Sequence, residues 1–429
     1  MSGDTIFALA TAQGRAGVAV VRISGAQAFD VARALCGKIP NGHEPALRTL
    51  VDQHSVAIDR ALVLRFDGPA SFTGEDTVEF HLHGSVAVVA AVLRTLGSGT
   101  GRLAEPGEFT RRALENNKMD LAQVEALGDL IEAETEAQRQ QAFHGMSGGL
   151  SERIEQWRAN LIRGAALIEA TIDFADEDVP LDVTPEVNAL LLSVRLDIED
   201  QLQGFKAAER VRNGFVVAIV GPPNAGKSTL LNALAQRNAA IVSETAGTTR
   251  DIIEVRMDLS GIPVTVLDTA GLRLGAEEIE KVGIHRAIDR ASDADLRIFL
   301  AEPGTDLPVK RVAGDIAVAP KADRRTDDVV AVSGKTGLGI RALVDAVTQE
   351  LAKRVSSAGL ISHERHRVAM EQSVIMLAAA VEHVELGPES YDIAAEEIRA
   401  SVRSLEAVIG RVDVENLLDE IFSSFCLGK

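Results

Sequence analysis

Cysteine is nearly absent from this chain of 429 residues, which contains only Cys36 and Cys426. Two thiols so far apart in sequence support neither a disulfide framework nor a zinc cluster, and we expect both to be reduced. Long apolar runs are absent as well, since no stretch approaches the length of a membrane span. The first ten residues lack the basic-then-apolar layout of a secretion signal. We therefore expect a cytoplasmic protein without a membrane segment.

Basic charge is also scarce, because the formal net charge is -19. This balance argues against a broadly basic coat for nucleic acid, so any RNA contact must be local or shared with a partner. The composition is 46% hydrophobic and 25% charged without low-complexity tracts, which is typical of a soluble globular protein. A chain of this length is expected to fold as two or three domains.

One stretch, from Asn213 to Thr229, predicts a phosphate-binding site. It consists of an apolar strand-like run, then Gly221-Pro222-Pro223-Asn224-Ala225-Gly226-Lys227-Ser228, then a helix-like run. The spacing G-x-x-x-x-G-K-S lets backbone N–H groups and a helix N-terminus converge on phosphate oxygens. Lys227 would then reach the β- and γ-phosphates, and the Ser228 hydroxyl would hold Mg²⁺.

The hydrophobic pattern changes along the chain and predicts the domain organisation. Residues 1–117 combine strand and helix patterns, residues 118–212 form long helices, residues 213–353 contain the phosphate-binding stretch, and residues 354–429 return to helices. The simplest architecture is a helical domain made from both flanks, with the nucleotide domain inserted into it. The long apolar stripes of the helical parts predict bundle cores and need no cofactor.

A strand predicted at residues 77–84 places Glu79, His81 and His83 on one face. A metal site there is one interpretation. Ordinary residues on a half-solvated strand face are the alternative, which we prefer because the spacing matches no standard ligand set.

Downstream of the phosphate-binding stretch, further pieces of a GTPase follow in the required order. A candidate first switch is Gly247-Thr248-Thr249-Arg250-Asp251. A later strand ends in Asp268-Thr269-Ala270-Gly271, where Asp268 would support Mg²⁺ and the Gly271 N–H would sense the γ-phosphate. In Pro320-Lys321-Ala322-Asp323 a proline replaces the usual Asn, whose amide contacts guanine. Asp323 and the turn Ser333-Gly334-Lys335 still provide guanine contacts. We therefore expect guanine preference with weaker affinity, and a peripheral helix trimmed between residues 300 and 321.

Taken together, these stretches resemble the MnmE (TrmE) family of tRNA-modifying GTPases over essentially the whole chain. Further marks of the resemblance are Asp4-Thr5-Ile6, Arg22-Ile23-Ser24-Gly25, Ser71-Phe72-Thr73-Gly74-Glu75-Asp76, Pro106-Gly107-Glu108-Phe109-Thr110, Lys118-Met119-Asp120-Leu121-Ala122-Gln123 and the terminal Phe425-Cys426-Leu427-Gly428-Lys429. The terminal pentapeptide is the most specific of them.

The resemblance implies a multidomain α/β plus all-α fold. Its parts would be an N-terminal α+β domain that binds a tetrahydrofolate derivative (5-formyl or 5,10-methylene) and forms a homodimer, a discontinuous helical domain, and an inserted Ras-like P-loop α/β GTPase domain. By matching positions, Arg22, Glu79, Lys118 and Lys429 would contact the folate. Taken one at a time, each of these four would otherwise be read as a surface charge.

The resemblance also implies a GTP site whose catalysis depends on K⁺ in place of an arginine finger. Asn224 and the region of Ser243, Thr245 and Thr248 would hold K⁺, and Ser228 with Thr249 would hold Mg²⁺. The implied GTP-binding residues are Asn224, Ala225, Gly226, Lys227, Ser228, Thr229, Ser243, Glu244, Thr245, Ala246, Gly247, Thr248, Thr249, Asp268, Thr269, Ala270, Gly271, Lys321, Asp323, Ser333, Gly334 and Lys335. The alternative for Asn224 is a bond to a loop carbonyl.

Two implied catalytic residues lie elsewhere. Glu280 matches a glutamate that orients the attacking water, although it is also one of several acids in its segment, and His285 stands where an acid is commoner. Cys426 matches the cysteine needed for tRNA modification; a nucleophilic role requires a lowered pKa, and a packing role is an equal alternative.

The function implied is GTP hydrolysis that powers installation of an aminomethyl or carboxymethylaminomethyl group at C5 of the wobble uridine of certain tRNAs. A flavoprotein of the MnmG (GidA) type would supply FAD and form a heterotetramer. The competing hypothesis is a GTPase switch of the Era or EngA kind in ribosome assembly, which predicts a basic RNA-binding appendage that the sequence lacks. A third is a GTP-dependent assembly module that binds only protein.

Overall fold

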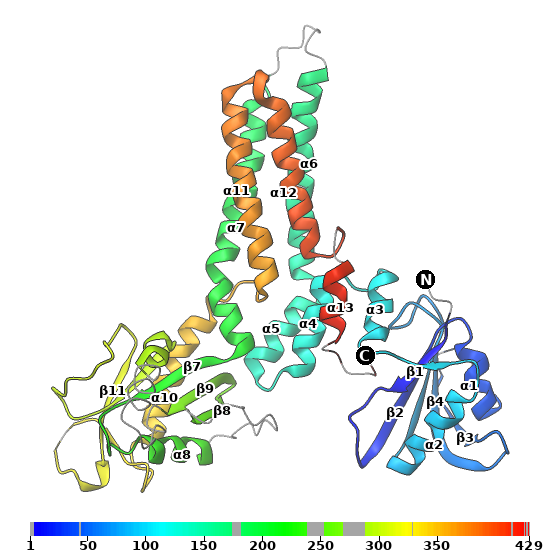
Figure 1. Ribbon diagram of the computed structural model, residues 1–429, viewed down its shortest axis with the longest axis horizontal. Coiled ribbons are helices and arrows are strands. Elements are labelled where there is room, and N and C mark those ends of the chain that lie inside the picture. The colour runs from blue at the N-terminus through cyan, green and yellow to red at the C-terminus, as the bar shows by residue number, and fades with distance from the viewer. Residues whose placement is uncertain are drawn as a thin grey trace, which may run out of the picture. The chain divides into compact units, whose positions relative to one another are not determined.

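The computed structural model describes residues 4–42, 44–173, 182–237, 253–268, 288–327, 329–412, 415–423, 425 and 428. The chain forms two compact units, one made of Met1–Gly128 with Glu406–Lys429 and the other of Asp129–Leu405. The ribbon is drawn in Figure 1.

The first unit contains a six-stranded sheet with the order β3-β4-β5-β2-β1-β6. Neighbouring strands are antiparallel except β1 and β6, which are parallel. The strands are β1 (Ile6–Leu9), β2 (Ala16–Ser24), β3 (Ala46–Val51), β4 (Ala57–Phe66), β5 (Thr77–Gly84) and β6 (Arg102–Leu103). The predicted mixed α/β character of this region is therefore confirmed.

Helices α1 (Ala28–Cys36) and α2 (Val86–Gly97) cover one face of this sheet (Figure 1). Alternate residues of the strands point toward the helices because side chains alternate between faces along a strand. One apolar core joins both helices to the strands, with Val21, Ile23, Phe80, Leu35 and Leu96 among its buried members. This packing leaves the opposite face of β2 and β5 for polar residues.

The first unit also includes α3 (Glu108–Glu115), the start of α4 (Leu121–Glu132) and α13 (Glu415–Ser423). The end of the chain contacts its beginning here. A β-carbon placed on Gly107, before α3, would lie 2.9 Å from the Phe422 carbonyl oxygen, and one on Gly428 would lie 2.1 Å from the Leu9 carbonyl oxygen. The sequence did not predict that Gly428 packs against the end of β1.

The second unit contains a helical bundle built from both flanks of the nucleotide domain, as predicted. Its helices are α5 (Glu136–Met146), α6 (Gly149–Asp173), α7 (Thr184–Asn213), α11 (Glu364–Leu386) and α12 (Tyr391–Val408). Buried hydroxyls link α11 and α12, because Ser373 Oγ lies 2.7 Å from Ser401 Oγ. Thr184 Oγ1 and the Tyr391 hydroxyl, 2.9 Å apart, link α7 to α12. No helix in the described part of the chain is long and apolar enough to cross a membrane.

The nucleotide domain of the second unit is a six-stranded sheet with the order β12-β11-β10-β7-β9-β8. All neighbours are parallel except β8 and β9. The elements are β7 (Phe215–Val220), α8 (Lys227–Arg237), β8 (Ile253–Leu259), β9 (Ile262–Asp268), β10 (Leu296–Leu300), β11 (Ile316–Pro320), β12 (Ala331–Val332) and α10 (Ile340–Val355). The predicted combination of an N-terminal mixed domain, a helical domain and a P-loop α/β domain is thus confirmed.

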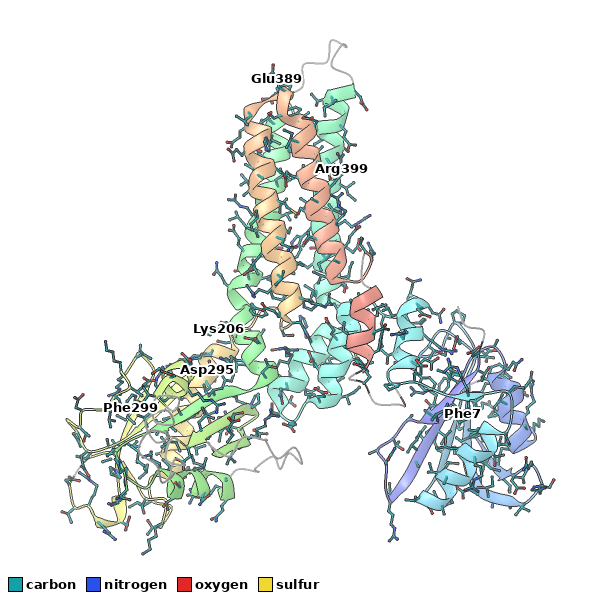
Figure 2. All side chains as sticks on the ribbon, viewed as in Figure 1. Phe7, Lys206, Asp295, Phe299, Glu389 and Arg399 are labelled. Carbon is teal, nitrogen blue, oxygen red and sulfur yellow. The ribbon has the colours of Figure 1, made fainter. Side chains whose placement is uncertain are left out.

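The connection between β10 and β11 contains turns in place of a helix, as its shortness predicted. A buried ion pair organises it: Arg297 Nε lies 2.9 Å from Asp315 Oδ2, and the Val312 N–H donates to the same carboxylate oxygen at 2.8 Å. Asp295, labelled in Figure 2, forms an ion pair with Arg210, whose Nε lies 3.0 Å from Asp295 Oδ1, and accepts a hydrogen bond from the Val216 N–H at 2.8 Å. It thereby ties the end of α7 to β7.

Candidate functional site

The predicted phosphate-binding loop lies between the carboxyl end of β7 and the start of α8. Asn224 has φ 60° and Gly226 has φ 97°, so both lie in the left-handed region that Gly and Asn tolerate best. The helix begins at Lys227, and the Leu230 N–H closes its first turn by donating to the Gly226 carbonyl at 2.8 Å. The earlier N–H groups of this helix are the donors that a phosphate requires.

Two hydrogen bonds hold the Lys227 side chain inside the phosphate-binding loop. Its Nζ donates to the Gly221 carbonyl at 2.9 Å and to the Pro222 carbonyl at 3.0 Å, and the residue is 7% exposed. Burial lowers the pKa of Lys227, while the nearby charge of Asp268 acts in the opposite direction. A phosphate would replace two neutral carbonyls with negative charge, which stabilises the ammonium form.

Asp268 is the last residue of β9 and is 1% exposed. Parallel pairing places it opposite Ile219, near the end of β7. Ser228 is exposed in the first turn of α8. The structure therefore brings a hydroxyl and a buried carboxylate to the same edge of the sheet, where the ends of parallel strands form ligand sites.

A cavity of about 290 Å³ connects the phosphate-binding loop with the predicted base-recognition residues. It is lined by Asn224, Ala225, Gly226, Thr229, Leu230, Leu300, Lys321, Asp323, Arg324, Val332, Ser333, Gly334 and Lys335. Nine of the predicted GTP-binding residues border this cavity, and they come from three separate stretches of sequence. The sequence analysis missed four lining residues, because none of them has a place in a nucleotide-binding motif: Leu230, Leu300, Arg324 and Val332.

Asp323 is oriented at the base end of the cavity. A side-chain hydrogen bond with Ser333 is the main cause that lowers the pKa of Asp323, and the charges of Arg324 and Lys335 act in the same direction. The carboxylate is thus kept as an ionised acceptor for N–H groups.

A second predicted site lies on the exposed face of the N-terminal sheet. Arg22 on β2 and Glu79 on β5 are directly opposite in the antiparallel register, and Arg22 Nε donates to Glu79 Oε1 at 2.9 Å. Both side chains are less than one-fifth exposed. The other Glu79 oxygen lies 3.3 Å from His81 Nε2. Lys118 lies beside the loop at residues 71–76, because a β-carbon on Gly74 would lie 3.3 Å from the Lys118 Cδ.

Two aromatic rings that the sequence analysis left without a role complete this cluster. The Arg22 guanidinium lies 5.1 Å from the Phe72 ring centroid and 5.6 Å from that of Phe109. A guanidinium at these distances is attracted to the ring faces. Both phenylalanines belong to the motif stretches at residues 71–76 and 106–110, which was the available signal.

A buried network fixes the loop that carries Phe72. Ser24 Oγ donates to Glu75 at 2.8 Å, and Arg112 of α3 donates to Glu75 at 3.1 Å and to Glu108 at 2.9 Å. Arg102 donates to Glu108 at 2.6 Å. The network connects the loop with the helix that carries Phe109, so it positions both rings.

The metal alternative for the β5 histidines gains no support. His83 Nδ1 lies 2.7 Å from Asp59 Oδ1, whereas His81 contacts Glu79. No group of three or more His, Cys, Asp or Glu side chains within the described ranges is arranged to hold a metal.

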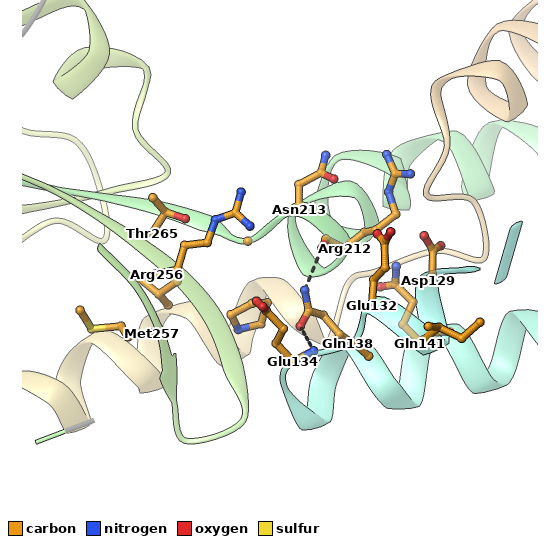
Figure 3. Close-up of a pocket in the computed structure, with 16 residues that line it drawn as sticks. Asp129, Glu132, Glu134, Gln138, Gln141, Arg212, Asn213, Arg256, Met257 and Thr265 are labelled. Carbon is orange, nitrogen blue, oxygen red and sulfur yellow. Dashed lines mark hydrogen bonds between the residues drawn. The ribbon is translucent and has the colours of Figure 1, made fainter. Parts of the chain in front are cut away.

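A larger cavity, of about 700 Å³, lies at the amino ends of β7 and β9, away from the phosphate-binding loop (Figure 3). Arg256 of β8 extends into it, facing the α5 side (Figure 3). Gln138 Nε2 donates to the Arg212 carbonyl at 2.9 Å. The ring of His363 contacts two side chains: its Nδ1 lies 2.8 Å from Arg212 Nη1, and its Nε2 lies 2.9 Å from Asp129 Oδ2. The residues that line this larger cavity belong to none of the predicted nucleotide-binding motifs, so the smaller cavity, which the motifs line, is the better candidate for the nucleotide.

Thirteen predicted site residues lie outside the described residues: Ser243, Glu244, Thr245, Ala246, Gly247, Thr248, Thr249, Thr269, Ala270, Gly271, Glu280, Cys426 and Lys429.

Comparison with known proteins gives consistent results. The family model "MnmE helical domain" matches residues 121–426, and "GTP-binding protein TrmE N-terminus" matches residues 5–118. A protein of Roseobacter denitrificans named "tRNA modification GTPase MnmE" is 58% identical over 427 residues, which cover 99% of this chain and 100% of that protein. The protein of the same name from Ruegeria pomeroyi has the same identity and coverage. The cytosolic domain of the T. maritima FeoB iron transporter covers 46% of this chain at 16% identity with a TM-score of 0.23, which is too low to support a conclusion.

Proposed function

The chain belongs to the MnmE (TrmE) family of tRNA modification GTPases, and from this premise we propose that it is a K⁺-activated GTP hydrolase that acts in wobble-uridine modification. With a flavoprotein partner, it installs an aminomethyl or carboxymethylaminomethyl group at C5 of the wobble uridine of certain tRNAs.

The observation that carries the GTPase part is the cavity that joins the phosphate-binding loop to Asp323 and Gly334. The phosphate-binding loop at one end carries N–H donors and the buried Lys227, which suit phosphates, and the other end offers a carboxylate acceptor. A purine nucleotide with a polyphosphate chain matches both ends.

Metal ions supply charge neutralisation at the phosphates in this class of reaction. The Ser228 hydroxyl and, from outside the described residues, Thr249 would hold Mg²⁺, and the buried Asp268 carboxylate would support it. The Asn224 side chain is exposed on the left-handed turn of the loop, so its carbonyl oxygen can contribute to a K⁺ site with Ser243, Thr245 and Thr248. Glu280 would orient the attacking water.

We further propose that residues 1–117 bind a tetrahydrofolate derivative (5-formyl or 5,10-methylene) and form a homodimer. The half-buried Arg22–Glu79 pair offers both a cation and an acceptor carboxylate beside two aromatic rings, which suits a pterin with its N–H groups and glutamate tail. Lys118 and Lys429 would add cations. The helical parts, residues 118–212 and 354–429, would connect this site to the GTPase part, residues 213–353.

The partner would be a flavoprotein of the MnmG (GidA) type that brings FAD and forms a heterotetramer. Because the chain has a net charge of -19, such a partner would provide most of the tRNA contacts. Cys426 would take part in the modification, either as a thiolate or by positioning the terminal segment.

The experiment is reconstitution of the full chain with the flavoprotein, GTP, folate and unmodified tRNA, followed by nucleoside analysis. A chain truncated by its last five residues should keep GTP hydrolysis and lose modification. Modification by the truncated chain, or none by the full chain, would contradict the proposal; the second result would favour an Era- or EngA-like switch.

A further inference from the structure

Pro320 occupies the position at which a base-recognition motif usually has Asn. It is the last residue of β11, is buried, and lies opposite Val332 of β12 in the parallel register. Proline has neither a backbone N–H nor a polar side chain, so this position contributes no hydrogen-bond donor to the base end of the cavity.

The remaining groups at that end can be matched with the edges of guanine. Guanine presents N–H donors at N1 and at its exocyclic amine, and acceptors at O6 and N7. The Asp323 carboxylate, held by Ser333, accepts from the donors. The N–H groups of Gly334 and Lys335 have no hydrogen-bond partner within the described part of the chain, so they are available to O6. Pro320 offers no amide N–H to N7.

The base loop, by which we mean residues 321–327 and 333–335, is positioned without an asparagine. Gly334 packs on the first turn of α8, where a β-carbon would lie 2.7 Å from the Thr229 carbonyl carbon and 2.9 Å from the Leu230 nitrogen. Lys321 adopts φ 59°, and its carbonyl accepts from the Arg324 N–H at 2.9 Å. Backbone packing thus does the positioning that an asparagine amide would otherwise do.

We propose that this chain recognises guanine only through N1, the exocyclic amine and O6, and that it leaves N7 without a hydrogen bond. Guanine nucleotides altered at N7 are therefore ligands as good as the natural ones. The inference rests on the proposed binding of guanine nucleotides and specifies how that site selects its base.

The test is a competition experiment with the full chain, Mg²⁺ and a fluorescent analogue of guanosine diphosphate. The competitor is either GDP or 7-deaza-GDP, which has a C–H in place of N7, and the dissociation constant of each competitor is measured. The wild-type chain should bind both within a factor of about two. The P320N variant gains an amide donor, so it should bind GDP roughly three- to tenfold more tightly and leave 7-deaza-GDP unchanged. Pro303→Asn, in an exposed turn, is the matched control and should behave as wild type.

The outcomes are distinguishable. If the wild-type chain binds GDP but binds 7-deaza-GDP tenfold or more weakly, another group of the lining, such as the Arg324 guanidinium, reads N7 and the inference is overturned. If neither nucleotide binds, the proposed function itself fails. The wild-type comparison decides the matter even where P320N does not fold, which circular dichroism would reveal.

Discussion

Gly334 and Thr229 are in direct backbone contact: a β-carbon on Gly334 would lie 2.7 Å from both the carbonyl carbon and the carbonyl oxygen of Thr229. Thr229 belongs to the first turn of α8, whose N-terminus would face the phosphates of a bound nucleotide, and Gly334 belongs to the base loop. The two ends of the nucleotide site are therefore coupled through one position that has no room for a side chain.

Gly334→Ala should weaken guanine nucleotide binding at least tenfold, because the added methyl group must displace backbone atoms of the phosphate-binding helix. The measurement is the dissociation constant of a fluorescent GDP analogue. Gly17→Ala is the control, since a β-carbon there meets nothing within 4 Å. Equal affinities for wild type and Gly334→Ala would show that the contact relaxes without cost.

Asp323→Asn should change the preferred base from guanine to xanthine. The amide can donate to the carbonyl that xanthine has in place of the guanine amine, whereas the carboxylate can only accept. We expect roughly tenfold or greater loss of GDP affinity and a clear gain for xanthosine diphosphate, measured by competition. Asp327→Asn, an exposed carboxylate of the same loop that pairs with Arg325, should leave both unchanged. Retained GDP preference in Asp323→Asn would place base recognition elsewhere.

Glu79→Gln should weaken 5-formyltetrahydrofolate binding roughly ten- to hundredfold, since a hydrogen bond to a charged group contributes about 1.5–3 kcal/mol. Titration calorimetry gives the dissociation constant, and the GTPase rate should stay at the wild-type value. The Asp59→Asn variant removes another carboxylate of the same sheet, paired with His83, and serves as the control. Undiminished folate binding by Glu79→Gln would remove the Arg22–Glu79 pair from the site.

Protonation of Glu108 should lower the stability of the N-terminal unit at acidic pH. Burial alone would raise its pKa, but the hydrogen bonds from Arg102, the Glu105 N–H and Arg112 outweigh burial and lower the pKa from 4.5 to about 2. A carboxyl whose pKa is lowered by folding stabilises the fold above its unfolded pKa. That stabilisation, on the order of 3 kcal/mol, is lost as the pH falls from about 4.5 to 2.

Glu108→Gln should therefore lower the unfolding temperature at pH 7, and the difference from wild type should shrink between pH 4.5 and 2. Scanning calorimetry measures both, with Glu115→Gln, an exposed carboxylate of the same helix, as control. A difference that does not change with pH would mean that the loss reflects packing rather than ionisation.

Most of the fold could be predicted from the sequence because it depends on local patterns. The apolar run at residues 215–220 formed β7, and the helical stripes on both flanks formed one bundle, in which α7 packs against α11 and α12. The short connection after Leu300 correctly indicated a missing helix. Each of these follows from period, length or a motif within one stretch of chain.

The features that the sequence could not provide depend on contacts between distant stretches. No periodicity indicates that Arg22 packs on Phe72 and Phe109, or that Arg112 reaches Glu75. The close approach of Gly334 to Thr229 likewise joins residues about a hundred positions apart, and only the fold places them together.

The most direct test of the whole account is the steady-state GTPase rate of the full chain in K⁺ buffer against Na⁺ buffer of equal ionic strength. Asn224→Ala is the test variant, and Pro223→Ala, its exposed neighbour in the loop, is the control. K⁺ should raise the GTPase rate of wild type and of Pro223→Ala at least tenfold over the rate in Na⁺, and Asn224→Ala should lose this stimulation. Equal rates in the two salts for the wild-type chain would contradict the account.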